Sequence, residues 1–250
     1  MELAGRIVLV TGGSGGIGSA ACQAFAREGA AVVVHYSEGR ERAEQVVGAI
    51  ESAGGRARSA RADITSAEEV RRLMEEVSSF AGAPRLDVLF NNAGVFPRAP
   101  IEQISVEEWD RVMAVNLRGS FLCVREALPL LRASGAARVI NISSNTMERG
   151  TPGTLHYVTS KAGLVGFTRG LARELAPEGI TVNCVVPSLV ATESADATYA
   201  HSIDIVVAAQ SIQRRQVPED LVGLLVFLAS DRSAFVTGQT INADGGLVFR

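Results

Sequence analysis

The chain has 250 residues, of which 47% are hydrophobic and 20% charged, and its formal net charge is -3 at pH 7. This slightly acidic balance argues against nucleic acid and anionic membrane surfaces as partners, and no apolar run reaches the ~18 residues of a membrane-spanning helix. We therefore expect a soluble, cytoplasmic protein that acts on a small molecule. Because no linker-like or repetitive tract divides the chain, residues 1–250 are expected to form one domain.

Three cysteines, Cys22, Cys123 and Cys184, fall in different predicted elements and lack the spacing of metal ligands. We expect them to be reduced, buried thiols without a chemical role. No metal site is expected.

Short β-type runs alternate with longer helical patterns along the chain, and several runs lack the polar alternation of half-exposed strands. The predicted strands are residues 6–10, 31–34, 57–62, 86–90, 138–142, 179–185 and 239–242. The predicted helices are residues 17–28, 38–53, 66–81, 105–133, 156–177 and 218–230. This βαβ alternation predicts an α/β fold of the Rossmann type, a doubly wound parallel sheet of about seven strands with helices on both faces.

The first predicted strand ends in the glycine-rich stretch of residues 11–18, Thr-Gly-Gly-Ser-Gly-Gly-Ile-Gly, where a helix begins. Glycines let a backbone approach a pyrophosphate closely, and a helix N-terminus supplies N–H donors and a positive dipole. An ordinary glycine-rich turn is the alternative. The strand before it and the helix after it favour a dinucleotide site.

Tyr157 and Lys161 are four residues apart in a predicted helix and therefore share one face. A neighbouring ammonium favours a phenolate, so we expect Lys161 to lower the pKa of Tyr157 from its usual value of ~10. The pair alone is weak evidence, because Tyr-x-x-x-Lys occurs on many solvated helices. Ser144, at the end of the predicted strand 138–142, strengthens it.

The glycine spacing Thr-Gly-x-x-x-Gly-x-Gly resembles that of the short-chain dehydrogenase/reductase family, and the resemblance extends over nearly the whole chain. It includes Asn91-Asn-Ala-Gly94 after the fourth strand and further matches at residues 187–192, 236–239 and 244–246. The resemblance implies four catalytic residues: Asn116, Ser144, Tyr157 and Lys161. It implies cofactor contacts at Gly12, Ser14, Gly16, Ile17, Gly18, Tyr36, Ser37, Asp63, Ile64, Asn92, Ala93, Gly94, Tyr157, Lys161, Pro187 and Thr192.

In the reductive direction, an oxygen that gains negative charge needs a hydrogen-bond donor and a proton. We expect Tyr157 to give the proton and Ser144 to fix the carbonyl. The resemblance implies that Lys161 binds the nicotinamide ribose and that Asn116 holds a water behind it. Each position also has a structural alternative: Asn116 satisfying a helix carbonyl, Asp63 capping the helix near Ser66, or Ser144 as a turn serine.

The cofactor is expected to be NADP, with NAD possible. The second strand ends in His35-Tyr36-Ser37 and lacks the aspartate that would repel a 2′-phosphate. Ser37 and Arg40 are candidate phosphate ligands, although Arg40 and Arg42 also fit the solvated face of a helix. Gly15 stands where many NADP-dependent relatives carry an arginine.

The resemblance implies a substrate pocket lined by residues 95–97, 146–155 and 187–213. Within it, residues 193–204 are polar and weakly periodic, which favours a mobile lid over a plain surface loop. His156 is expected to flank the pocket without a catalytic role.

Among family branches, the chain looks closest to 3-oxoacyl-acyl-carrier-protein reductases and related ketone reductases. Those enzymes present basic residues to an acidic carrier, whereas this chain has residues 134–137, Ser-Gly-Ala-Ala, and Glu178 there. A small ketone, secondary alcohol or sugar-like polyol is therefore the expected substrate, and the carrier-bound substrate is the alternative. A catalytically silent dinucleotide sensor, and epimerisation or dehydration, are further alternatives.

Residues 162–172, in the helix that carries Tyr157, have small and apolar side chains on more than one face. A partner subunit covering this surface explains the pattern. Relatives assemble through this helix, so a homotetramer, or a dimer, is expected.

Overall fold

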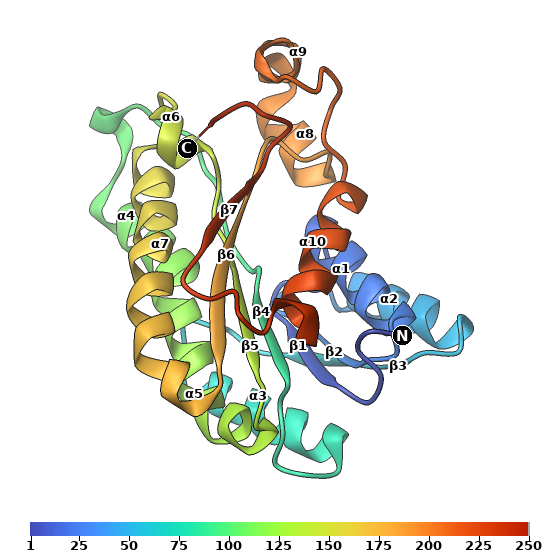
Figure 1. The fold of residues 1–250 in the computed structure, drawn as a ribbon. Helices are drawn as coiled ribbons and strands as arrows, with labels where there is room; N and C mark the ends of the chain where they lie inside the picture. Colours follow the sequence, from blue (N-terminus) through green and yellow to red (C-terminus); the bar gives the residue numbers. More distant parts are fainter. Residues whose placement is uncertain (250) are drawn as a thin grey trace.

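A seven-stranded, wholly parallel sheet forms the centre of the computed structural model, which describes residues 1–249 (Figure 1). Its strands are β1 (Ile7–Val10), β2 (Ala31–Tyr36), β3 (Arg56–Arg61), β4 (Val88–Asn91), β5 (Arg138–Ile142), β6 (Thr181–Pro187) and β7 (Thr240–Ala243). The strand order is β3-β2-β1-β4-β5-β6-β7. The predicted fold, a doubly wound α/β domain, is confirmed.

Burial explains why these strands carry nearly continuous apolar runs. All residues of β1, β2, β4, β5 and β6 are buried, because helices cover both faces of the sheet. The edge strand β3 alternates exposed arginines with buried alanines. Charged side chains on an edge strand discourage pairing with another chain.

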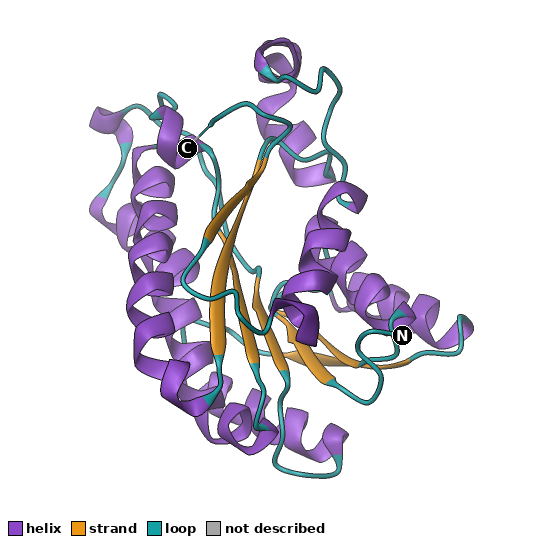
Figure 2. Cartoon of the chain, in the orientation of Figure 1, coloured by secondary structure: helices purple, strands orange, loops and turns teal. Residues whose placement is uncertain are grey.

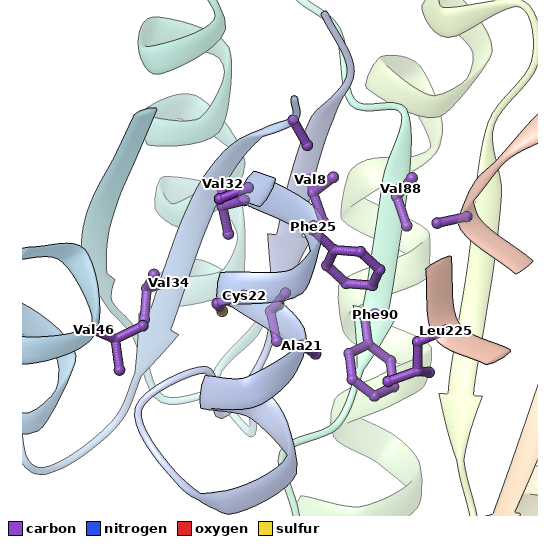
Figure 3. Close-up of a cluster of buried hydrophobic side chains, with 14 of the residues drawn as sticks. Val8, Ala21, Cys22, Phe25, Val32, Val34, Val46, Val88, Phe90 and Leu225 are labelled. Atoms are coloured by element: carbon purple, nitrogen blue, oxygen red, sulfur yellow. The ribbon is translucent and has the colours of Figure 1, made fainter. Parts of the chain in front are cut away.

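Two helical layers enclose the sheet, as Figure 2 shows with purple helices on either side of orange strands. The helices of one layer are α1 (Gly16–Arg27), α2 (Arg40–Ser52) and α10 (Glu219–Ala229), and those of the other are α3 (Ala67–Ala81), α5 (Gly119–Ser134) and α7 (Leu155–Leu175). Phe25 of α1 meets Phe90 of β4 edge to face, with ring centroids 6.4 Å apart, and Leu225 of α10 belongs to the same cluster (Figure 3). This packing holds α1, and the glycine-rich loop before it, against the sheet.

The helix predicted over residues 105–133 is divided into three segments. They are α4 (Val106–Met113), a π-helical segment (Ala114–Arg118) and α5. Asn116 lies in the π-helical segment, where its side chain pairs with the backbone of Val95. A π-helical turn widens the helix locally and is frequent at functional sites.

The segment expected to be an irregular lid contains regular structure. It forms α8 (Glu193–Tyr199), a 3₁₀ turn (Ala200–Ser202) and α9 (Ile203–Ala209), which Figure 1 places beyond the upper ends of β6 and β7. Thr192 accepts a hydrogen bond from the backbone N–H of Ala195, and Ala195, Tyr199 and Val206 are buried. The few apolar residues among polar ones were sufficient for one buried face, so the segment forms helices that the sequence analysis did not predict.

Four further short elements were not predicted, and they connect the main layers. They are α6 (Thr146–Arg149) and 3₁₀ turns at Ile101–Gln103, Ala176–Glu178 and Asp231–Ser233. Of these, α6 matters most for the site, because it follows the short loop after β5 that contains Ser144.

The three cysteines are buried and unpaired, as predicted. Within residues 1–249, no helix is long and apolar enough to cross a membrane. Over the same residues, no group of three or more His, Cys, Asp and Glu side chains is arranged to hold a metal ion.

Candidate active site

A cavity of about 390 Å³ lies where the sequence analysis places the site, at the carboxyl ends of the strands. The strand order reverses between β1 and β4, and ligands of open α/β sheets bind at this switch point. Eleven of the predicted residues line the cavity: Gly12, Gly16, Ile17, Asn92, Ala93, Gly94, Ser144, Tyr157, Lys161, Pro187 and Thr192. The structure thus brings together the glycine-rich loop and three of the four predicted catalytic residues.

The glycine-rich loop is held by hydrogen bonds to the end of β4. The Thr11 hydroxyl accepts from the backbone N–H groups of Asn92 and Ala93, at 2.9 and 3.1 Å. In return, the Asn92 amide donates to the carbonyls of Thr11 and Gly12, at 2.9 and 3.1 Å. The two strand ends are thereby fixed relative to each other.

Glycine is required in this loop for steric reasons. A Cβ at Gly18 would lie 2.2 Å from the carbonyl oxygen of Gly12. A Cβ at Gly16, where φ is +36°, would lie 2.6 Å from Cγ2 of Thr192. The helix α1 begins here without a side-chain cap, so its first N–H groups remain available to an anion.

His35 supports the glycine-rich loop through a hydrogen bond with Gly12, a role that the sequence analysis did not assign. Its Nδ1 accepts from the backbone N–H of Gly12 at 3.1 Å, and its Nε2 lies 2.9 Å from the carbonyl of Ala62. The imidazole therefore carries its proton on Nε2. Burial lowers the pKa of His35 to about 4, so it is neutral at pH 7.

Ser144, Tyr157 and Lys161 converge from two elements. The Ser143 hydroxyl donates to the Lys161 carbonyl at 2.8 Å and so ties the end of β5 to α7. Ser144 accepts a hydrogen bond from the Thr146 hydroxyl at 2.9 Å, which orients its own proton away from α6. The Lys161 ammonium donates to the carbonyl of Ile142 at 2.9 Å and lies 5.8 Å from the centre of the Tyr157 ring.

Asn116 fastens the loop that follows β4. Its amide donates to the Val95 carbonyl at 2.8 Å and to the Ser160 hydroxyl at 3.0 Å, and its Oδ1 accepts from the Val95 N–H at 2.8 Å. The suggested alternative, satisfaction of a helix carbonyl, is therefore wrong. A Cβ at Gly94 would lie 3.1 Å from this Oδ1 and 3.4 Å from the Lys161 ammonium, so glycine is needed there to keep both groups close.

Burial has the largest effect on the pKa values of Tyr157 and Lys161. It raises the pKa of Tyr157 to about 12, against a smaller lowering by a hydrogen bond from Ser144. It also lowers the pKa of Lys161 to about 8. The net shift of the tyrosine pKa is therefore upward, because burial disfavours the phenolate more than the hydrogen bond from Ser144 favours it.

Comparison with known proteins agrees with this geometry. A family model described as enoyl-(acyl carrier protein) reductase matches residues 12–248. A short-chain dehydrogenase/reductase from Serratia marcescens superimposes with a TM-score of 0.93 at 36% identity, over 99% of both chains. The chain belongs to the short-chain dehydrogenase/reductase family.

Two further members of the family illustrate its range. A 3-oxoacyl-[acyl-carrier-protein] reductase of Synechocystis sp. is 38% identical over 247 residues, 98% of each chain. A candidate NAD(P)-dependent gluconate 5-dehydrogenase from Beutenbergia cavernae, with NADP bound at low occupancy, has a TM-score of 0.91 and 35% identity over 98% of each chain.

Several residues that the family resemblance assigned to the site lie outside the cavity. Ser14 and Gly18 belong to the glycine-rich loop, Tyr36 and Ile64 are buried, and Ser37 is exposed at the end of β2. Asp63 closes a turn by accepting from the N–H and hydroxyl of Thr65, both at 2.8 Å, while Ser66 caps α3. Asp63 is therefore not the helix cap that was considered for it.

At the substrate end of the cavity, Phe96, Arg149 and Tyr199 fall within the ranges expected to line the pocket, whereas Arg98 lies outside them. Phe96 lies between Tyr157 and Tyr199, with ring centroids 6.4 and 6.0 Å away, and the Tyr199 hydroxyl donates to the Phe96 carbonyl at 3.3 Å. Arg98 and Arg149 also line the cavity. His156 is buried and pairs with Glu108 of α4 at 2.9 Å, away from the cavity.

These pKa values predict how the reductive activity depends on pH. Below about pH 8 both Tyr157 and Lys161 are protonated, whereas above pH 8 the lysine loses its charge first. We expect kcat/KM for reduction to fall above about pH 8, by up to tenfold per pH unit. In Lys161→Arg, whose guanidinium stays charged, any remaining activity should show no such fall. A parent profile that stays flat to pH 10 contradicts this assignment.

Proposed function

We propose that this short-chain dehydrogenase/reductase interconverts a carbonyl and a secondary alcohol in a small molecule, using NADP or NAD and Tyr157 as the general acid or base. The observation that carries the proposal is that Ser144, Tyr157 and Lys161 line the same cavity as the glycine-rich loop. A protein that only senses a dinucleotide would not need a phenol and a buried ammonium side by side at its binding site.

The residues around the cavity fit a dinucleotide. The uncapped N-terminus of α1 suits a pyrophosphate. Because residues 12, 16 and 18 are glycines, no side chain there prevents the phosphates from approaching the backbone. In the proposed complex, the loop of residues 12–18 holds the phosphates and Lys161 holds the nicotinamide ribose. The bound nicotinamide supplies or accepts the hydride.

The chain's own residues handle the proton and the charge on oxygen. Ser144 donates a hydrogen bond to the substrate oxygen and thereby holds the carbonyl beside the phenol. Tyr157, protonated at neutral pH, transfers its proton to that oxygen as negative charge develops. Asn116 keeps the neighbouring loop in place through Val95, and we propose that it also positions a water behind Lys161.

The tyrosine provides the direct test. Tyr157→Phe should lower kcat by at least about a hundredfold, because general acid catalysis contributes 10²–10⁴-fold. Its affinity for NADPH, measured by fluorescence titration, should change little, since Lys161 and the loop remain. A Tyr157→Phe enzyme that is folded, binds NADPH and has the kcat of the parent would contradict the proposal.

We propose a preference for NADP over NAD. Arg40, a candidate phosphate ligand, lies 3.7 Å from Glu44. The structure adds Arg42 as a second candidate, because its guanidinium folds over Gly39 and lies 3.8 Å from Glu193. Both ion pairs are exposed and therefore weak, so either arginine can exchange its partner for a phosphate. The NADP bound to the Beutenbergia protein is consistent with this preference.

Substitution of either arginine by alanine tests the preference for NADP. Removal of the arginine that contacts the 2′-phosphate, in Arg40→Ala or Arg42→Ala, should reduce kcat/KM for NADPH about tenfold, the usual worth of a hydrogen bond to a charged group. The kcat/KM for NADH should be unchanged. Arg72→Ala, an exposed arginine on α3, is the matched control. A parent enzyme whose kcat/KM is well above that for NADPH when NADH is the cofactor would refute the preference.

For the substrate, we propose a small ketone, secondary alcohol or polyol. Reduction of a 3-oxoacyl group on a carrier protein is the second candidate, favoured by the name of the Synechocystis relative. Against it, Glu178 pairs with Arg132 through two hydrogen bonds, at 2.6 and 2.9 Å. This pairing neutralises an arginine on a surface that an acidic carrier would have to approach.

We also propose a cytoplasmic homotetramer, or a dimer, assembled through α5 and α7. A shallow groove on their outer side includes Leu117, Phe121, Gly163 and Phe167, and the Phe121 side chain is 44% exposed. Burying this apolar surface against another copy removes it from water. Light scattering should give a mass of two or four chains, and Phe121→Glu should lower it. A monomeric parent contradicts the proposal.

A further inference from the structure

The charged side chains that line the cavity are all cationic, although the chain as a whole is acidic. Among the described residues they are Arg98, Arg149 and Lys161, and none is Asp or Glu. Lys161 has a role in the proposed reaction. The two arginines have none, and neither belongs to the glycine-rich loop that fits the cofactor phosphates.

Arg149 is free to bind a ligand. It ends α6, the short helix that follows Ser144, it is exposed, and its guanidinium forms no hydrogen bond or ion pair with another of the described residues 1–249. Two acidic residues of the lid have other partners: Glu193 lies 3.8 Å from Arg42, and Asp196 pairs with Arg215. Neither of these two carboxylates neutralises the guanidinium of Arg149, and the third acidic residue of the lid, Asp204, does not line the cavity.

Arg98, in contrast, is held in place by contacts with other residues. One of its nitrogens donates to the carbonyl of Pro152 at 3.3 Å, and another lies 3.2 Å from Nε2 of His201. Its guanidinium is also 5.3 Å from the centre of the Tyr199 ring. These contacts leave it close to the turn that follows Arg149, since Pro152 is part of that turn.

We propose that the substrate carries a carboxylate, which Arg149 binds and whose charge Arg98 further stabilises, so that the reaction interconverts a keto acid and a hydroxy acid. The inference rests on the proposed function and specifies its substrate. A planar guanidinium binds a carboxylate through two parallel hydrogen bonds, and a cavity lined by one sign of charge concentrates ligands of the other sign. A phosphate ester offers the same oxygens in a larger group, and the experiment separates the two.

The experiment compares matched ketones that differ in one charge. Acetoacetate is paired with acetoacetamide and levulinate with levulinamide, and NADPH consumption gives kcat and KM for each. The parent enzyme should prefer the acid of at least one pair about tenfold or more in kcat/KM, mainly through KM. Arg149→Gln should abolish this preference and leave the amide unaffected, Arg149→Lys should restore part of it, and Arg98→Gln should reduce it.

Arg173→Gln, an exposed arginine at the far end of α7, is the control and should retain the parental preference. Continued turnover of the amide shows that each variant is folded. Equal efficiency for acids and amides in the parent overturns the inference, as does an Arg149→Gln variant that loses affinity for NADPH but keeps the preference.

Three other substrates separate the remaining alternatives. Preference for dihydroxyacetone phosphate over dihydroxyacetone, without preference for the acids, overturns the carboxylate in favour of a phosphate. Preference for an acetoacetyl thioester over both acetoacetate and its amide overturns it in favour of an acyl carrier. Failure of the proposed function itself is distinguishable, because then no ketone in any form is reduced with either cofactor.

Discussion

Tyr157 and Lys161 lie close together at the carboxyl edge of the sheet, where the lysine is buried and the tyrosine is partly exposed to the cavity. Burial opposes the charged form of each group, which raises the pKa of Tyr157 to about 12 and lowers that of Lys161 to about 8. The carbonyl of Ile142 partly compensates the ammonium, and the hydrogen bond from Ser143 to the Lys161 backbone keeps α7 against β5. The phenol consequently remains a proton donor at neutral pH.

Parallel strands make this arrangement possible, because all their carboxyl ends lie along one edge. Thr11 and Asn92 are 81 residues apart in the chain and form direct hydrogen bonds there. Asn116, in the π-helical segment between α4 and α5, accepts a hydrogen bond from Val95 in the loop after β4. The glycines at 16, 18 and 94 remove the side chains that would otherwise separate these segments.

Charge is distributed unevenly between the surface and the cavity. The chain has more acidic than basic residues, yet Glu193 and Asp196 of α8 are paired with surface arginines. Arg98 and Arg149 line the cavity, and no residue that lines it with them is Asp or Glu. This distribution of charge is the basis of the proposed preference for an anionic substrate.

The sequence by itself determined the order of strands and helices, the glycine-rich loop and the spacing of Ser144, Tyr157 and Lys161, because hydrophobic periodicity and short motifs are local properties. Tertiary packing decided the rest. The pKa shifts depend on burial, the π-helical segment at Asn116 on its bonds to Val95, and the helices α8 and α9 on apolar contacts too sparse to form a clear periodic pattern. The contacts of His35 and Arg98 could not be seen in the sequence either, since His35 bonds Gly12 and Ala62, Arg98 bonds Pro152 and His201, and only the folded chain brings these residues together.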